Sequence, residues 1–326
     1  MNLAATAPAM RLAIVSLRPT HGANSQRRRF EELAELDSRK VHALTDDPSS
    51  ADVILFVDLH LAPWHLRDLV DHPVRREFPD RTLVYCDRDR PWCVAPGIYV
   101  CMPSSGFRPE WQTAWLYVDT PSHITRDMNV EPDLLFSFVG ARTHPCRDAV
   151  LSLSSPRAIV EDSSGFLFHD SSSPNFEARY DRFRSTLHRS KFVVCPRGHG
   201  TSSYRLLETM AAGRVPVIVS DDWEAPAGVD WGACSIRVPE NRAGQLSSLL
   251  AEREPDYPRM SVAAARVHDN LFGPEVALHS MIEQCRALLE RSDPSRFPLN
   301  GVRDRSWRRL AAGEARARIR RVAGRE

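Results

Sequence analysis

Short apolar runs alternate with helix-like stretches along most of the chain. The runs are rich in Val, Ile and Leu and lack strict polar alternation, which is typical of strands buried on both faces of a parallel sheet. They predict strands at Leu12–Ser16, Asp52–Val57, Thr82–Cys86, Leu135–Val139, Ala158–Val160, Phe192–Cys195, Val215–Val219 and Ser235–Val238. Helical patterns lie between them at Arg28–Leu36, Arg182–His188 and Ser203–Ala212. This repeated order of strand and helix predicts a doubly wound α/β fold.

A polar stretch, residues 120–133, contains two prolines, lacks periodicity and divides these elements into two groups. We predict an N-terminal Rossmann-like lobe over residues 1–128 and a second lobe over residues 129–291. An Arg-rich helical tail, residues 292–326, would follow. Two such lobes face a central cleft, and open α/β sheets bind ligands beyond the carboxyl ends of their strands.

The composition favours a cytoplasmic protein. No apolar run approaches the roughly 18 residues of a membrane span. The short apolar run near the start follows no basic segment, so it indicates a first strand rather than a signal peptide. The seven cysteines are odd in number and irregular in spacing, which favours reduced thiols over a disulfide framework.

The net charge of +1 hides an uneven distribution. Residues 301–326 hold nine arginines and three acids, a net of +6, which leaves −5 for the rest of the chain. Because Trp307, Leu310 and Ile319 lie among these arginines, the tail could contact the inner membrane surface, and this would suit a lipid-linked acceptor. A solvated helix is the simpler interpretation, and no nucleic-acid partner is expected.

One segment, "KFVVCPRGHGTSSYRLLETMAAGRVPVIVSDDW" over residues 191–223, carries more specific chemistry. It predicts a strand, a loop over residues 196–202, a helix and a second strand. A right-handed crossover places that loop and the aspartates Asp221 and Asp222 at the same edge of the sheet. Gly198 and Gly200 would allow the backbone to approach a ligand closely.

The predicted helix begins directly after this loop, so its free N–H groups and dipole favour an anion there. Arg197 and His199 add donors from the loop. Arg205 suits a pyrophosphate, and Glu208, three residues later on the same helix face, suits the paired hydroxyls of a ribose. A solvated ion pair between Arg205 and Glu208 remains the alternative.

This segment resembles the nucleotide-sugar-binding core of the exostosin-like glycosyltransferases, glycosyltransferase family 47. The resemblance extends over about residues 83–290 and is strongest over residues 135–240. It includes "FSFVGARTHPCRDAVLSL" and "VDWGACSIRVPE". The matching motif residues are Ser190, Phe192, Cys195, Pro196, Arg197, Gly198, Ser203, Arg205, Glu208, Pro216, Val217 and Asp221, followed by "WEAP".

The resemblance implies a GT-B fold and an inverting transfer of a sugar from a nucleotide diphosphate sugar, with a UDP-sugar favoured. It places Arg197, Arg205 and Glu208 in the donor site, and Gly140 and Arg142 near the diphosphate. The acceptor would be a hydroxyl of a glycan, a lipid-linked or a small molecule. No metal or other cofactor would be obligatory.

Two alternatives stay open. Asp87 and Asp89 form a DxD pattern after a predicted strand, which in a metal-dependent glycosyltransferase would hold a divalent cation on the diphosphate. The same pattern occurs in solvated turns, since Arg88 and Arg90 can neutralise the acids. The other alternative is a catalytically silent module that only binds sugar nucleotides.

An inverting transfer needs a base for the acceptor hydroxyl, and the N-terminal lobe would supply it. His21 follows the first predicted strand, and Asp58 and His60 follow the second. A histidine can act as a base near neutral pH with little change in its pKa. We therefore predict His21 as the base, with Asp58 as the second candidate.

Overall fold

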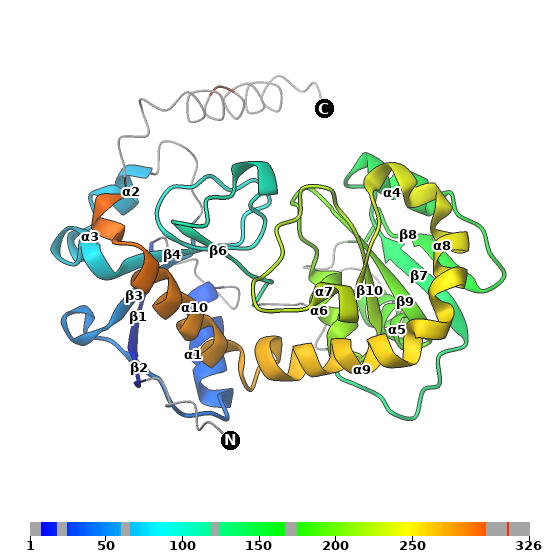
Figure 1. Cartoon of the computed structure of the whole chain (residues 1–326), viewed down its shortest axis with the longest axis horizontal. Coiled ribbons are helices and arrows are strands. Elements are labelled where there is room, and N and C mark those ends of the chain that lie inside the picture. The colour runs from blue at the N-terminus through cyan, green and yellow to red at the C-terminus, as the bar shows by residue number, and fades with distance from the viewer. Residues whose placement is uncertain are drawn as a thin grey trace.

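The computed structural model describes residues 8–17, 25–59, 66–118, 124–166, 175–297 and residue 312. Two sheets lie side by side, each with helices packed against it (Figure 1). The first has the strand order β2-β1-β3-β4-β5-β6 and the second β11-β10-β9-β7-β8. Every strand pairing in both sheets is parallel. The chain therefore has two parallel-sheet α/β lobes, as a GT-B fold does.

The N-terminal lobe is built around buried strands, because β3 and β4 have no exposed residue in the sequences VILFV and TLVYC. Three of its strands, each of three residues, are too short to give an apolar run and were not predicted from the sequence. The strands are β1 Arg11–Ser16, β2 Ala43–Thr45, β3 Val53–Val57, β4 Thr82–Cys86, β5 Gly97–Tyr99 and β6 Gln112–Ala114. The helices are α1 Gln26–Leu36, α2 Leu66–Val70 and α3 Pro73–Glu77.

The C-terminal lobe matches the predicted elements closely. Its strands are β7 Leu134–Gly140, β8 Ala158–Asp162, β9 Ser190–Pro196, β10 Val215–Val219 and β11 Ile236–Arg237. Its helices are α4 Pro145–Leu151, α5 Phe176–His188, α6 Tyr204–Ala211, α7 Trp231–Cys234, α8 Leu246–Arg253 and α9 Tyr257–Val267.

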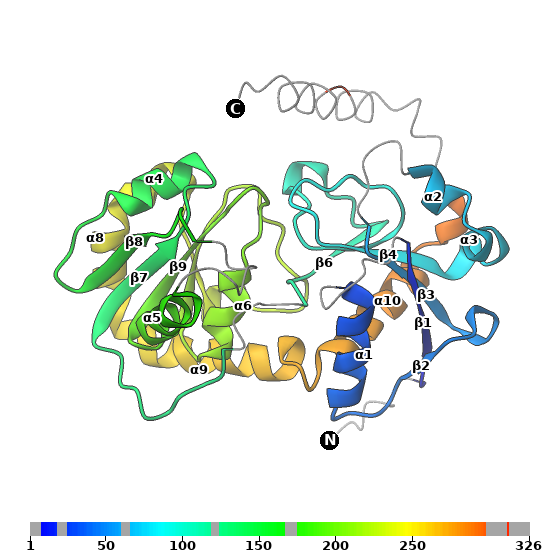
Figure 2. The ribbon, with the colours of Figure 1, turned by 180° about the vertical axis from the view of Figure 1, so that it is seen from behind.

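Helices cover both faces of this second sheet. Phe138 packs in one cluster with Leu250 of α8, whereas its neighbour Val139 packs in another with Leu187 of α5. Figure 2 shows α5 in front of the sheet when the molecule is seen from behind. Successive strand residues thus face two apolar layers, which explains why the strands are continuously apolar.

The strand order of the second sheet reverses between β7 and β9. The chain runs from β7 outward to β8, then returns to β9 on the other side of β7 and continues to β10 and β11. The loops after β7 and β9 therefore diverge at their carboxyl ends, at Gly140 and Pro196. Such a switch point is where doubly wound sheets bind ligands.

The last long helix, α10 (Ala277–Arg291), returns to the N-terminal lobe. A π-helix, His268–Phe272, connects it to α9. Arg291 donates to the Gln112 carbonyl and to Thr113 Oγ1, at β6. Thus α10, which the predicted boundary at residue 291 assigns to the C-terminal lobe, packs against the N-terminal sheet.

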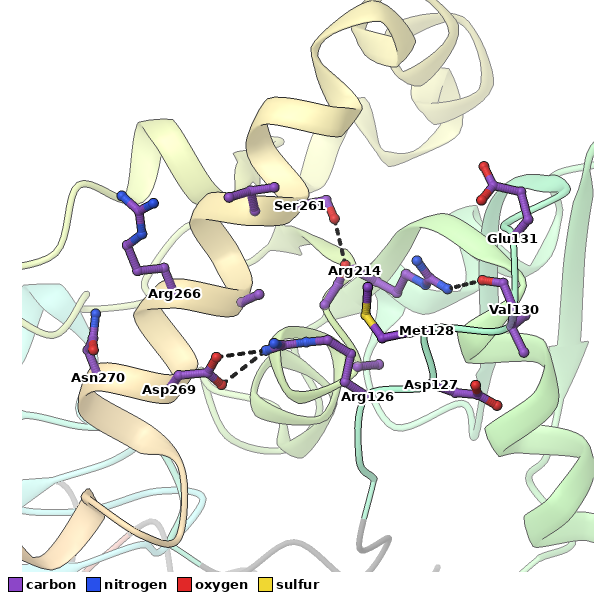
Figure 3. Close-up of a pocket in the computed structure, with 14 residues that line it drawn as sticks. Arg126, Asp127, Met128, Val130, Glu131, Arg214, Ser261, Arg266, Asp269 and Asn270 are labelled. Carbon is purple, nitrogen blue, oxygen red and sulfur yellow. Dashed lines mark hydrogen bonds and ion pairs between the residues drawn. The ribbon is translucent and has the colours of Figure 1, made fainter. Parts of the chain in front are cut away.

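A cavity of about 480 Å³ lies where the segment between the lobes meets α9 and the π-helix (Figure 3). Arg126 Nη2 donates to both carboxylate oxygens of Asp269 across it, at 3.0 and 3.1 Å. Arg214 directly precedes β10 and also lines this cavity. The cavity therefore lies toward the amino ends of the strands, away from the loops that carry the predicted site. Within the described residues no helix is long and apolar enough to cross a bilayer.

Candidate functional site

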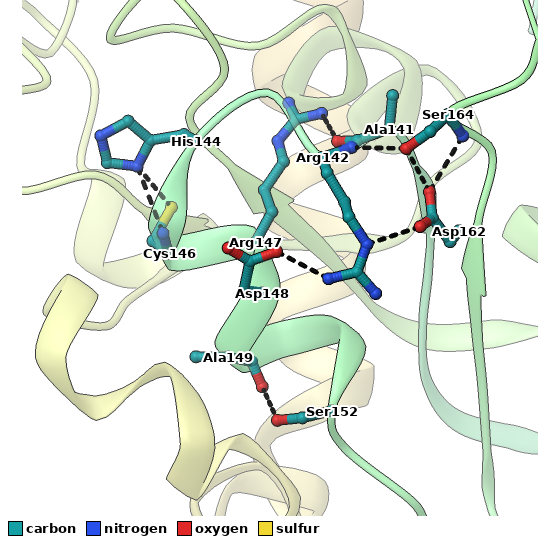
Figure 4. Close-up of polar contacts among 10 residues, drawn as sticks. All are labelled: Ala141, Arg142, His144, Cys146, Arg147, Asp148, Ala149, Ser152, Asp162 and Ser164. Carbon is teal, nitrogen blue, oxygen red and sulfur yellow. Dashed lines mark hydrogen bonds and ion pairs between the residues drawn. The ribbon is translucent and has the colours of Figure 1, made fainter.

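Arg147 on α4 bridges the two loops that diverge at the switch point. Its Nη1 donates to the Ala141 carbonyl at 2.9 Å, after β7. Its Nε and Nη2 donate to the carbonyls of Arg197 and Pro196 at 2.8 and 3.1 Å, at the end of β9. Figure 4 shows the guanidinium group directed at the loop after β7. One side chain thus fixes the spacing of both loops.

Arg147 is also a buried charge. Its partners are carbonyls, and the described residues provide no carboxylate that pairs with it. Burial, and then the positive charge of Arg205, lower the pKa of Arg147 to about 10. The group remains charged at neutral pH, so it leaves a positive potential at the switch point.

Arg205, the arginine of the predicted donor site, lies on the other side of the β7 end. Its Nη2 donates to the Val139 carbonyl, and its guanidinium group lies 5.0 Å from the Phe138 ring and 5.7 Å from the Phe183 ring. Burial lowers the pKa of Arg205, and among the described residues its Nε has no hydrogen-bond partner. The guanidinium group thus packs in the core of the lobe and bonds to β7 through Nη2. Only its other N–H donors are available to a diphosphate.

Within the part of the chain that the structure describes, four buried hydroxyl groups near these loops lack a hydrogen-bond partner. Burying a hydroxyl without a partner is costly, so such groups often mark the place of a ligand or an ordered water. Thr201, Ser202 and Ser220 are 3%, 6% and 4% exposed, which makes them part of the interior. The unpartnered oxygens belong to Thr143, Thr201, Ser202 and Ser220.

The loop after β9 needs its first glycine for packing. A Cβ on Gly198 would lie 3.1 Å from Thr143 Oγ1 and 3.2 Å from Arg147 Nη2. The neighbouring Arg197 is held only loosely, with Nη1 at 3.7 Å from Glu240 Oε1 and Nε without a partner. Among the predicted donor-site arginines, Arg197 therefore has the guanidinium group that is best able to reorient and bind an anion.

The helix after this loop begins as predicted. Ser203 is the N-cap residue of α6, in extended conformation, and its side chain makes no capping hydrogen bond. Glu208 is 6% exposed and lines a cavity of about 170 Å³ between the lobes. Arg29 and Leu33 of α1 form the opposite wall of this cavity. Glu208 is thus an interior side chain facing the N-terminal lobe.

Gly140 and Arg142, expected near the diphosphate, differ in their roles. A Cβ on Gly140 would lie 2.8 Å from the Phe138 ring and 3.1 Å from Arg205 Nη2, so glycine permits the close approach of Arg205. Arg142 is exposed and paired with Asp148 at 2.7 Å and Asp162 at 2.6 Å (Figure 4). These two carboxylates hold Arg142 at the surface of α4, away from the bridge that Arg147 makes.

The two aspartates after β10, Asp221 and Asp222, also differ in their contacts. Asp221 Oδ1 accepts from the Glu240 N–H at 3.0 Å, and Glu240 Oε1 accepts from the Asp221 N–H at 3.1 Å. This reciprocal pair stabilises the turn. Asp222 accepts a hydrogen bond from Ser104 N–H of the N-terminal lobe through its carbonyl, so its segment joins the lobes.

Asp58, the second candidate base, is surrounded by donors. Its carboxylate accepts from Ser16 Oγ, from Ser25 Oγ at 3.1 Å and from the Gln26 N–H at 2.8 Å. It is 2% exposed and has a positive φ of 55°. These bonds tie β1, β3 and the start of α1 together, which is a structural role. His21, the first candidate, lies outside the described residues, as does His60.

Two groups of side chains have the composition of a metal site. The first is His42, His279 and Glu283. The Met10 N–H donates to His42 Nδ1 at 3.1 Å, so the neutral ring carries its proton on Nε2, which lies 2.9 Å from Glu283 Oε1. This nitrogen therefore pairs with the carboxylate and has no lone pair for a metal.

The second group is His144, Cys146 and Glu240, beside the loop after β9. Burial raises the pKa of the Cys146 thiol to about 11, so the thiolate that metals prefer is scarce. Burial, and then the charge of Arg197, lower the pKa of His144. Because this arginine would also repel a cation, the group is better suited to supporting the loop than to binding a metal.

The DxD residues lie at the contact between the lobes. A Cβ on Gly200, in the loop after β9, would lie 2.6 Å from Cys101 Sγ and 2.9 Å from Asp89 Oδ1. Neither Asp87 nor Asp89 belongs to a cluster of three or more potential metal ligands among the described residues. Asp89 therefore faces the loop of the C-terminal lobe and is not part of a remote turn.

Sequence reasoning missed Arg147 and the buried hydroxyls. The only signal for Arg147 was its position within an otherwise apolar helix face, between Cys146 and Val150. Thr201 and Ser202 are hydroxyl residues of the polar loop that precedes α6, so the sequence alone does not distinguish them from exposed residues. Their burial depends on the approach of the N-terminal lobe, which no local pattern records.

Residues 95–252 match the family model of the exostosin GT47 domain. A 75-residue stretch is 40% identical to the Exostosin-1 homolog of Caenorhabditis elegans, covering 22% of this chain and 20% of that protein. A 74-residue stretch is 38% identical to the probable glucuronoxylan glucuronosyltransferase IRX7 of Arabidopsis thaliana, covering 22% of this chain and 16% of that protein. The matches thus span a fifth or less of these relatives.

Solved structures resemble the chain at low identity. The Anabaena Alr3699/HepE structure in complex with UDP-glucose aligns with 85% of this chain and 100% of that chain, at 9% identity and a TM-score of 0.46. WaaG, a glycosyltransferase involved in lipopolysaccharide biosynthesis, aligns with 86% and 99% at 11% identity and a TM-score of 0.40. The chain's own two parallel sheets define the fold, and residues 95–252 are similar to the exostosin GT47 domain.

Proposed function

We propose that this protein is a glycosyltransferase that moves a sugar from a nucleotide diphosphate sugar to an acceptor hydroxyl. The observation that carries the proposal is the pair of buried guanidinium groups, Arg147 and Arg205, at the switch point of the second sheet. The two charges repel each other, and within the described residues no carboxylate forms an ion pair with Arg147, while the nearby Glu208 carboxylate favours the charged form of Arg205. A bound dianion would compensate both, which supports a diphosphate site.

The other loop residues fit the parts of such a donor. Arg197 can turn from its long contact with Glu240 to the diphosphate, with two donors in one plane. The unpartnered hydroxyls of Thr201, Ser202 and Ser220 can bond to phosphate or sugar oxygens. Glu208 supports binding of the ribose hydroxyls from the side of the cavity between the lobes.

The finer features of the proposal come from the family and from the neighbours' names. We propose a UDP-sugar donor, since the Anabaena neighbour was solved with UDP-glucose and a relative is named as a glucuronosyltransferase. We further propose inversion at the anomeric carbon and no obligatory metal. The acceptor is proposed to be a hydroxyl of a glycan, a lipid-linked or a small molecule.

Calorimetric titration with UDP, with and without EDTA, tests the proposal. We expect binding that EDTA leaves unchanged. Arg197→Gln should weaken it by about 1.5–3 kcal/mol, the usual contribution of a hydrogen bond to a charged group. Arg242→Gln is the matched control, because Arg242 is exposed and contacts Gln245 on the same lobe. Absence of UDP and GDP binding by folded protein would refute the proposal.

The two alternatives give different results in the same experiment. A metal-dependent enzyme that uses Asp87 and Asp89 would lose UDP binding in EDTA. A silent sugar-nucleotide-binding module would bind UDP but neither hydrolyse nor transfer the sugar of UDP-glucose, UDP-glucuronate or UDP-N-acetylglucosamine. A thermal-shift screen with these three donors identifies the one to use.

A further inference from the structure

We infer that Asp89 is the base that accepts the proton of the acceptor hydroxyl, an inference that rests on the proposed glycosyltransferase function. Asp89 follows β4 of the N-terminal lobe, so its carboxylate lies at the carboxyl edge of that sheet. The contact between Gly200 and Asp89 brings this edge against the loop that follows β9. The carboxylate is thus in the lobe opposite the donor and directed at it.

The surroundings of Asp89 connect it to the proposed donor site. Its charge is close enough to raise the pKa of Arg147, although burial outweighs this effect. It also lies beside Cys101, whose Sγ accepts from the Ser202 N–H of the same loop. A carboxylate at this position faces the place where the sugar attached to a diphosphate at Arg147 and Arg197 would project.

Asp89 is available, whereas Asp58 is not. Three donors occupy the Asp58 carboxylate, and this side chain is buried. Asp89 is exposed, and within the described ranges its carboxylate has no hydrogen-bond or ion-pair partner. A base must keep a lone pair free for the incoming hydroxyl, and Asp89 meets this requirement.

The step balances without a further reactant. The acceptor O–H gives its proton to the Asp89 carboxylate, and the oxygen forms a bond to the anomeric carbon. The bond from that carbon to the diphosphate oxygen breaks on the opposite face, so the configuration inverts. Its electron pair leaves with the nucleoside diphosphate, whose negative charge the guanidinium groups of Arg147 and Arg197 stabilise.

Asp89→Asn tests the assignment. Turnover should fall by about 10²–10⁴-fold, the usual contribution of general-base catalysis. UDP affinity, measured by calorimetry, should stay within threefold of wild type. The substrate is the UDP-sugar that the donor screen selects, with water as the acceptor.

The matched control is Asp80→Asn, at the opposite end of the same strand. Asp80 lies just before β4 and is exposed, so its variant should turn over like wild type. Undiminished turnover of the Asp89→Asn protein would overturn the inference alone, as would a loss of UDP binding or dependence on a metal. If wild-type protein fails to bind UDP, both this inference and the proposed function are overturned.

Discussion

We expect Glu208 to contact a different part of the UDP donor than the arginines do. It lines the cavity between the lobes, whereas Arg147 and Arg197 lie at the loops after β7 and β9. Glu208→Gln should therefore weaken UDP binding, by about 1 kcal/mol for one lost hydrogen bond. It should leave the affinity for inorganic pyrophosphate unchanged. Calorimetry with both ligands checks this, and equal losses for UDP and pyrophosphate would contradict the assignment.

Asp58 is expected to matter for stability. Asn at this position has one carbonyl oxygen in place of two carboxylate oxygens, so at least one of the donors Ser16, Ser25 and Gln26 loses its acceptor. Leaving a buried donor unpaired costs about 1–3 kcal/mol. Asp58→Asn should lower the free energy of unfolding in urea by this amount. A variant that is as stable as wild type but catalytically inactive would restore Asp58 as the candidate base.

The residue types of the site could be predicted from the sequence better than their roles. Arg205 and Glu208 both lie in the interior on α6, and their spacing along the helix fixes which face they share. Arg205 bonds to the Val139 carbonyl, which lies 66 residues away in the sequence. No local sequence signal predicts this contact. His21 stays a prediction, since it lies outside the described residues.

At the scale of an element, the loop after β9 sets how closely the lobes approach. A Cβ on Gly200 would lie 2.6 Å from Cys101 Sγ, closer than real contacts allow. Gly200→Ala should push this loop and the Cys101 segment apart, lowering both the melting temperature and turnover. Gly244→Ala is the control, because a Cβ there meets nothing within 4 Å. Equal melting temperatures and rates for the two variants would contradict the close contact.

The elements themselves were largely predictable where burial is continuous. The predicted strands Thr82–Cys86 and Val215–Val219 have the observed bounds, since both are apolar runs between polar segments. The strands β5 and β6 were missed because each has three residues. Their stability depends on the pairing of β5 with β4 and of β6 with β5 rather than on a local pattern. The return of α10 to the first lobe was likewise not predictable, since helical periodicity does not identify the sheet or helix against which a helix packs.

For the whole molecule, partly buried histidines predict loss of stability in mild acid. Burial is the main cause that lowers the pKa values of His42, His72, His144, His188 and His268. The unfolded chain, with an ordinary histidine pKa of about 6.5, takes up these protons more readily than the folded chain. The stabilisation is therefore complete above that pH and is lost as the pH falls through the lowered values.

Urea unfolding at pH 8 and at pH 5.5 measures this effect. We expect a smaller free energy of unfolding at pH 5.5. His268→Gln should reduce the difference between the two pH values, because the His268 side chain is only 14% exposed at the π-helix that connects the lobes. An equal or larger free energy of unfolding at pH 5.5 would contradict the prediction.

The central claim is that the loops at the switch point of the second sheet hold a nucleoside diphosphate. Hydrogen exchange of the backbone amides with and without saturating UDP tests it most directly, because it reports where the ligand lies. We predict that UDP slows exchange at residues 141–147 and 196–203, with no change at α3 in the N-terminal lobe. Unchanged exchange at both loops in protein that binds UDP would contradict the account.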